Sequence, residues 1–345
     1  MTNSQEAMPE NIGPPSSEPY LDADGKPIMA LSFCVLADVL GISRATIACQ
    51  SIEESQEICT RLHDALNEYR SYAREMSDPK YFTPTGSFTA FSDLIVIGEK
   101  IPDTSQDAES ELGQILSSVM IHQTNMALEG FFVRGGLAIG ELHLSPQMCF
   151  GKALIKAHRL EQEADFPRII ISNGVDALMQ HHLTHYSDPG RAPHAMDFVR
   201  DEDSRVFVNY LQASNLGDYT DNVLLKKHKE IIEQRLAEFK GNDRIRPKYE
   251  WLRDYHNFFC SNFYWGFDMD EVEHELVTTV CDDALLIESG SGETRAFSRV
   301  AEIADYGREP LKNKAFSPWI DFTKLSAIDD QQFFADDSGP TEMKR

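Results

Sequence analysis

The segment Phe33-Cys-Val-Leu-Ala-Asp-Val-Leu-Gly-Ile-Ser43 carries one aspartate, Asp38, within an apolar run of strand length. A second run, Phe91-Ser-Asp-Leu-Ile-Val-Ile97, carries Asp93 in the same way. A carboxylate on a buried strand is unfavourable unless a cation compensates it. Two such strands side by side would bring both aspartates to the same pair of divalent metal ions. The alternative is structural, with Asp38 ending a strand and Asp93 lying in a turn.

The composition limits the possible partners. The 345 residues include 56 acidic and 32 basic side chains, which gives a formal net charge of −24. Neither duplex nucleic acid nor an anionic membrane would attract such a chain, so we expect neither as a partner. A ligand that carries phosphate would need local cations or metal. The six cysteines form no CxxC pair, and no signal peptide or spanning segment is found, so we expect a reduced, cytoplasmic protein.

The pattern along the chain predicts four parts. Residues 1–27 are rich in Pro, Ser and Glu and are expected to form a disordered leader. Residues 28–215 are expected to form the catalytic domain, 216–265 a helical extension packed on it, and 266–345 an acidic C-terminal appendage. Apolar periodicity predicts the following elements: strands at 30–38, 87–91, 94–97, 131–140, 168–172 and 205–211, and helices from Ser51, at 107–129, 150–163 and 176–180, and within 221–263.

The order strand, helix, strand, strand, helix, strand predicts an α+β fold of ferredoxin-like type. We expect an antiparallel-dominated sheet with helices packed on one side.

The residues around Asp38 suit phosphoryl or nucleotidyl transfer. That chemistry uses two metal ions on the attacking and leaving oxygens, and carboxylates are suitable ligands for hard divalent ions. The turn Val39–Ser43 can offer successive backbone N–H groups to a triphosphate, with Gly41 allowing close approach. Arg159 is a candidate for the cation at the reacting phosphate, because guanidinium matches the charge of the transition state.

These motifs resemble those of class III nucleotidyl cyclases. Phe33–Ser43 is similar to their first metal motif, Ser92-Asp93 to their second metal aspartate, and Arg134-Gly-Gly-Leu-Ala-Ile-Gly140 to their glycine-bearing central strand. Gly151–Arg159 has the spacing of their last helix, and Arg159 matches its transition-state arginine. The family's asparagine position on that helix holds Ile155, so this chain departs from the pattern that positions ribose.

Two further departures concern the base. The positions at which purine cyclases read adenine or guanine hold Thr89 and Met148, so the purine-reading pair is missing. The chain is most similar to the pyrimidine cyclases of bacterial Pycsar antiphage systems. The supporting segments lie between residues 30 and 263: Phe91-Ser-Asp93, Arg134-Gly-Gly-Leu137, Phe150–Ala157, Leu160-Glu161 through Phe166–Ile171, Lys248–Trp251 and Tyr255-His-Asn257.

The resemblance implies a class III cyclase fold and a homodimer with two shared active sites. It implies two metal ions per site, Mn²⁺ or else Mg²⁺. Arg159 would come from the other chain, and the activity would be conversion of UTP to 3′,5′-cyclic UMP and pyrophosphate. A separate effector protein would read the product in antiphage defence. The implied roles are metal binding by Asp38, Asp93 and the carbonyl of Val39, phosphate binding by Gly41, Ile42 and Ser43, and contact with the base by Phe88, Thr89, Phe91 or Met148.

Other functions stay open at this point. A cytidylate cyclase differs from a uridylate cyclase by one exchange of donor for acceptor in the pocket. A purine cyclase and a non-catalytic nucleotide-binding module are further alternatives.

Three other groups have competing interpretations. Histidines 181, 182 and 185 suggest a metal site or a solvated loop. Arg134 could bind phosphate or form an ion pair. Aromatic residues Tyr249, Trp251 and Tyr255 suggest core or dimer packing.

Overall fold

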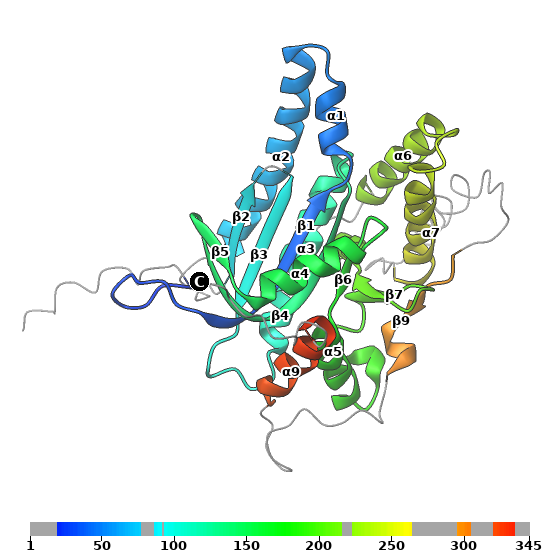
Figure 1. Cartoon of the computed structure of the whole chain (residues 1–345). Coiled ribbons are helices and arrows are strands. Elements are labelled where there is room, and N and C mark those ends of the chain that lie inside the picture. Colours follow the sequence, from blue (N-terminus) through cyan, green and yellow to red (C-terminus); the bar gives the residue numbers. More distant parts are fainter. Residues whose placement is uncertain are drawn as a thin grey trace, which may run out of the picture.

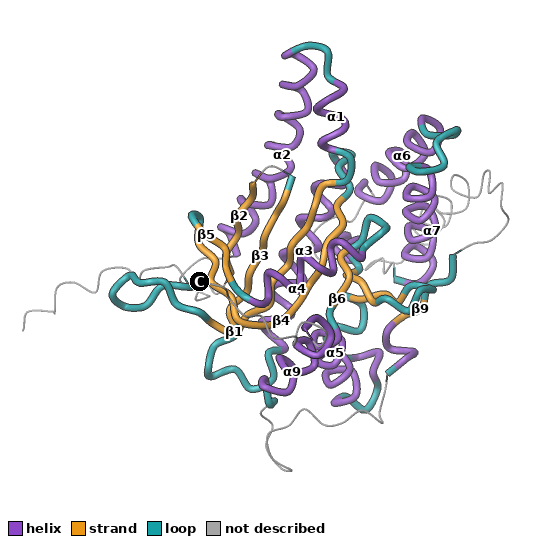
Figure 2. The backbone as a smooth tube through the Cα atoms, in the orientation of Figure 1, coloured by secondary structure: helices purple, strands orange, loops and turns teal. Residues whose placement is uncertain are grey.

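The central strand of the sheet is β1 (Ala30–Val39), which contains Asp38. In the computed structural model it pairs on one side with β3 (Leu94–Lys100) and on the other with β4 (Val133–Ser145), both antiparallel (Figure 2). The structure describes residues 19–76, 86–91, 93–215, 223–263, 295–304 and 320–334. The middle of β1, Phe33–Ala37, is apolar and buried, which suits a central strand whose edges and faces are all covered.

Within the described residues the sheet has nine strands in the order β2-β3-β1-β4-β6-β8-β7-β9, with β5 paired to β4. Among these described strands only β4 and β6 pair in parallel, and the other pairs are antiparallel. The expected α+β class with an antiparallel-dominated sheet is therefore confirmed. The remaining strands are β2 (Gly86–Phe91), β5 (Met148–Phe150), β6 (Ile169–Ile171), β7 (Phe198–Arg200), β8 (Val206–Val208) and β9 (Ser298–Arg299).

The two faces of the sheet follow from the strand register. Residues directly opposite one another on antiparallel strands share a face, and neighbours along a strand alternate. One face carries Thr89, Val96, Leu36 and Gly136, and also Asp38 two residues from Leu36. Helix α4 (Lys152–Glu163) packs on this face. A Cβ at Gly136 would lie 2.3 Å from Cβ of Leu160, so the absence of a side chain lets α4 approach.

The opposite face carries Phe88, Ile97, Val35 and Leu137 and is covered by helix α3 (Glu109–Leu128). The ring of Phe88 lies 6.2 Å from that of His122 in α3. The expectation of helices on one side is therefore wrong. The apolar stripes of α3 and α4 bury opposite faces of the same sheet, which a list of elements in order does not reveal.

The other helices complete the described chain, and α1 and α2 project from one end of the sheet (Figure 1). The predicted helix at 176–180 is longer, and the predicted strand at 205–211 is shorter, ending where a 3₁₀ helix begins. Their bounds are α1 (Ile42–Ala48), α2 (Ile52–Met76), α5 (Asn173–His185), α6 (Val223–Glu238), α7 (Arg246–Asn262) and α9 (Phe322–Phe334), with 3₁₀ helices at Pro189–Arg191, Tyr210–Asn215 and Val300–Ile303.

The two ends of the chain also contribute. Residues 19–27, within the stretch expected to be disordered, contain Tyr20, which is 1% exposed and donates to the hydroxyl of Ser32 (3.0 Å); residues 1–18 lie outside the described ones. Near the other end, β9 pairs with β7, and α9 lies beside α5 (Figure 1). Among the described residues, no helix combines the length and apolarity that a membrane crossing requires.

Candidate active site

Asp38 and Asp93 meet where β1 ends beside the β2–β3 turn. The backbone N–H of Val39 donates to the carbonyl of Asp93 (3.1 Å), and the hydroxyl of Ser43 donates to its carboxylate (3.1 Å). Asp38 is opposite Leu94, the residue that follows Asp93. The predicted convergence of the two aspartates on neighbouring strands is therefore present, with Asp93 in the turn rather than in a strand.

The surroundings of Asp38 are electrostatically compensated. Burial raises the pKa of its carboxyl, the guanidinium of Arg134 lowers it, and the negative charge of Asp93 raises it again. Nε of Arg134 lies 3.5 Å from Oδ2 of Asp38, and Nη2 lies 2.7 Å from the carboxylate of Glu161 in α4. Lys248 of α7 is close enough to lower the pKa of Asp38 further. Arg134 therefore forms an ion pair.

The two carboxylates fit a divalent cation. Each is partly buried, and the repulsion between them is one cause of the raised pKa of Asp38. A cation between them would relieve both the burial and the repulsion. Among the described residues, no three His, Cys, Asp or Glu side chains gather as a metal cluster. Among the described His, Cys, Asp and Glu side chains, Asp38 and Asp93 would thus be the only ligands, with oxygens such as the Val39 carbonyl beside them.

The turn after Asp38 has the geometry that glycine allows. Gly41 has φ 80° and ψ 2°, in the left-handed region, and a Cβ there would meet nothing within 4 Å. Its backbone conformation, rather than lack of space, therefore favours glycine. Leu40 is fixed by a hydrogen bond from its N–H to the carbonyl of Phe132 (2.8 Å). Helix α1 begins at Ile42, which is buried, and Ser43 is exposed.

Arg159 lies on α4 but belongs to a different group of contacts. Its guanidinium donates to the carbonyl of Phe333 and lies 5.1 Å from the ring centre of Phe334, both in α9. Glu161, two residues along α4, faces Arg134 and the Asp38 side. Residues two apart on a helix differ by about 200° in direction. Arg159 therefore points away from the aspartates of its own chain.

The candidate base-contacting residues are spread over different surfaces. Thr89 shares the face of Asp38, whereas Phe88 lies on the opposite face against His122. Met148, on β5, is 48% exposed. The side chain of Phe91 lies outside the described residues. Of these three described side chains, Thr89 is the one that lies on the same face of the sheet as Asp38, the face that α4 covers.

One of the three histidines and two of the three aromatic residues are buried in the described chain. Histidines 181, 182 and 185 lie on helix α5 rather than in a loop. His182 is buried, contacts the carbonyl of Asp107 (3.0 Å), and has its pKa lowered to about 3 by burial. Trp251 and Tyr255 are buried and stacked on each other, which confirms core packing for that pair.

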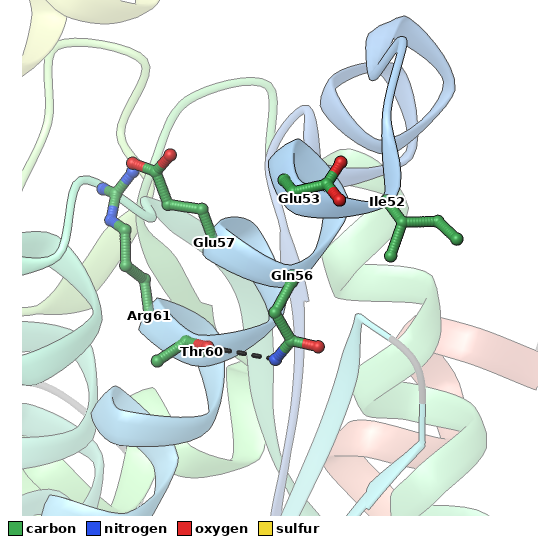
Figure 3. Close-up of a pocket in the computed structure, with 6 residues that line it drawn as sticks. All are labelled: Ile52, Glu53, Gln56, Glu57, Thr60 and Arg61. Carbon is green, nitrogen blue, oxygen red and sulfur yellow. Dashed lines mark hydrogen bonds between the residues drawn. The ribbon is translucent and has the colours of Figure 1, made fainter.

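A shallow depression lies along the first turns of α2 (Figure 3). It shares no residue with the Asp38–Asp93 cluster. Within it, the amide of Gln56 donates to the hydroxyl of Thr60 (3.2 Å). Its lining residues are Ile52, Glu53, Gln56, Glu57, Thr60 and Arg61.

Two residues beyond the predicted set lie beside Arg134 and Asp38, namely Glu161 and Lys248, and a third, Phe334 of α9, contacts Arg159. The first two lie in segments that carry the family resemblance, but no local pattern marks their contact with Arg134 or Asp38. Phe334 is separated from Arg159 by 175 positions in the chain, and the sequence contains no signal for that contact.

No protein-family model and no curated protein matches the chain. Solved structures give weak similarities. One is the catalytic core of a rhodopsin-guanylyl cyclase with converted specificity in complex with ATPαS, at 12% identity and TM-score 0.34, covering 52% of this chain and 94% of that one. A bacterial light-regulated adenylyl cyclase has 13% identity and TM-score 0.34, covering 55% and 57%. The adenylate/guanylate cyclase/hydrolase from Silicibacter pomeroyi has 20% identity and TM-score 0.29, covering 52% and 95%. Similarities with TM-scores this low are not evidence of a shared activity.

Proposed function

We propose that this protein is a pyrimidine nucleotide cyclase that converts UTP to 3′,5′-cyclic UMP and pyrophosphate. The observation that carries the proposal is the meeting of Asp38 and Asp93 beside the Gly41 turn, with the Asp38 carboxyl partly buried. Paired carboxylates next to a glycine turn suit a metal-bound triphosphate.

In the proposed reaction the 3′-hydroxyl oxygen attacks the α-phosphorus. The new P–O bond forms as the bond to the β-phosphate oxygen breaks, pyrophosphate leaves, and the hydroxyl proton passes to solvent. Divalent cations, Mn²⁺ or Mg²⁺ and two per site, would lower the pKa of that hydroxyl and neutralise the developing charge. Asp38, Asp93 and the carbonyl of Val39 would hold them.

The phosphates would be bound by the turn after β1. The N–H groups of Gly41, Ile42 and Ser43 lie before or in the first turn of α1, where backbone donors lack helical partners. Arg134 already offsets the charge of Asp38 and lies at the same edge. We propose that it also offsets phosphate charge when nucleotide is bound.

The active site is proposed to be shared between two copies of the chain. Arg159 points away from its own aspartates, and an arginine is needed where charge develops in the transition state. In a homodimer, Arg159 of the partner subunit would supply it. The exposed apolar side chains Met148, Phe150 and Ile155, on β5 and α4, are suited to the same interface.

The base preference is proposed from the purine-reading positions. Thr89 and Met148 cannot provide the charged contacts that purine cyclases use, so a smaller pyrimidine is the proposed substrate. The role as a second-messenger synthase, with a separate effector in antiphage defence, is proposed from the resemblance alone.

The decisive test is an assay of purified protein with each of the four ribonucleoside triphosphates and MnCl₂, with products identified by mass. Cyclic UMP from UTP is the expected result. Cyclic CMP from CTP would move the substrate to the cytidylate alternative, and a cyclic purine would contradict the pyrimidine assignment. No cyclic product from any triphosphate would leave a non-catalytic nucleotide-binding module.

A further inference from the structure

Helix α9, near the end of the chain, covers the side of α4 that carries Arg159. It contacts α4 at three positions spaced along one face of that helix: Lys152, Lys156 and Arg159. Residues at such spacing line one stripe of a helix. In Figure 1, α9 (red) lies beside α5 and below α4. A segment far along the chain is therefore built against the proposed catalytic helix.

The first part of the contact is a buried anchor. Asp329 is fully buried and accepts hydrogen bonds from the hydroxyl of Ser172 (2.9 Å) and from the backbone N–H groups of Ile139 (3.3 Å) and Gly174. Nζ of Lys156, itself fully buried, lies 2.9 Å from Asp330 and 3.9 Å from Asp329. Separation would leave buried charges uncompensated, which is strongly unfavourable. The anchor thus belongs to the folded core and is not a weak surface contact.

The second part of the contact falls on Arg159 itself. One turn beyond the anchor, the carbonyl of Phe333 accepts from the guanidinium, and the ring of Phe334 lies 5.1 Å from it. A long side chain with several rotatable bonds is held at two points. The ring attracts the positive charge of the guanidinium, and the hydrogen bond to Phe333 fixes one of its N–H donors.

We propose that α9 is a positioning element for Arg159, with Phe334 and the Phe333 carbonyl as the positioning groups. The inference rests on the proposed function, in which Arg159 serves the active site of the partner subunit. A transition-state cation is most effective when its orientation is fixed before the reaction. The buried anchor fixes α9, and α9 fixes Arg159. The C-terminal segment is thereby part of the catalytic apparatus.

The test is Phe334→Ala in the full-length protein. We expect kcat to fall roughly fivefold to tenfold, because a cation–aromatic contact has about this effect. KM for the triphosphate should be unchanged, because Phe334 is proposed to act on the transition state alone. The matched control is Phe322→Ala at the other end of α9, which should retain wild-type kcat.

A double-mutant comparison separates positioning from general destabilisation. In an Arg159→Lys background, Phe334→Ala should cause no further loss of kcat, because the group that it positions is already altered. An equal loss in both backgrounds would overturn the inference in favour of a structural role. A rise in kcat on Phe334→Ala would overturn it in favour of an inhibitory contact.

A readout independent of activity completes the test. The NMR signal of the Arg159 guanidinium, identified by its absence in Arg159→Lys, should move in Phe334→Ala because the ring current is lost. An unchanged signal would overturn the inference whatever the activity. Failure of the wild-type protein to cyclise any triphosphate would overturn the proposed function instead, and the contact with α9 would still be judged by the signal.

Discussion

The two faces of the sheet differ in the following ionisable groups: ion pairs on the α4 face and a buried, neutral histidine on the α3 face. The α4 face carries charged groups in pairs, with Arg134 between Asp38 and Glu161, and Lys156 beside Asp329 and Asp330. On the α3 face, His122 is fully buried, and burial lowers its pKa to about 4, so it is neutral near pH 7. The charged groups of the α4 face are thus paired with opposite charges, whereas burial favours the neutral form of His122 on the α3 face.

The α4 face itself contains two kinds of site. The pair Asp38–Asp93 is open to a cation and is built from the end of β1 and the neighbouring β2–β3 turn. The Lys156–Asp329 anchor is closed and built from segments far apart in the chain. The first arrangement suits binding and the second suits rigidity. Arg159 lies next to the closed group, so its side chain is held in place, as its proposed role in the site of a partner subunit requires.

The largest expected effect is the loss of activity when either Asp93 or Arg159, the groups that the two chains would contribute to one proposed site, is replaced. Asp93→Ala and Arg159→Ala should each reduce kcat at least about 1000-fold, because each removes a group that is proposed to stabilise the transition state. An equimolar mixture of the two variants, after subunit exchange, should recover about one quarter of the wild-type rate. Half of the dimers would be mixed, and each would have one intact site.

The control for that mixture is either variant alone at the same total concentration, which should show no recovery. If the mixture stays as inactive as its components although mixed dimers form, Asp93 and Arg159 act within one chain. The shared site would then be wrong, and α9 would be holding Arg159 for some other purpose.

Sequence reasoning was most successful where the signal is local. The strand around Asp38, the Gly41 turn and the β2–β3 turn at Asp93 follow from apolar runs and glycine punctuation, and all are present. The ion pairs of Arg134 with Asp38 and Glu161 depend on register and on how α4 crosses β4, which no run of residues specifies. The contact of α9 with Arg159 depends on a tertiary fold over more than 170 positions, and the polar sequence after residue 264 gave no indication of it.

The next largest effect concerns the Lys156–Asp329 anchor, and we expect it in the free energy of unfolding. Lys156→Met would leave Asp329 buried without its cation, so we expect the free energy of unfolding to fall by about 3 kcal/mol. Lys152→Met is the matched control, since Lys152 also pairs with Asp330 (3.2 Å) but is half exposed, and it should lose less than about 1 kcal/mol. Urea unfolding of both variants measures the difference. Equal losses would mean that the anchor is no stronger than a surface ion pair.

The smallest expected effect is a change in the pH dependence of stability when His122, on the α3 face, is replaced. His122 has a folded-state pKa of about 4, below the ordinary value of 6.5, so only the unfolded chain takes up its proton between these values. Its contribution to stability is therefore complete above pH 6.5 and is lost as the pH falls towards 4, by roughly 2 kcal/mol between pH 7 and pH 5. His122→Leu should lose that much less stability over the same interval in urea unfolding.

His158→Leu, at an exposed position of α4, tests whether loss of any histidine has the same effect. If His122→Leu and wild type lose equal stability on acidification, His122 takes up its proton in the folded protein, and burial does not keep it neutral.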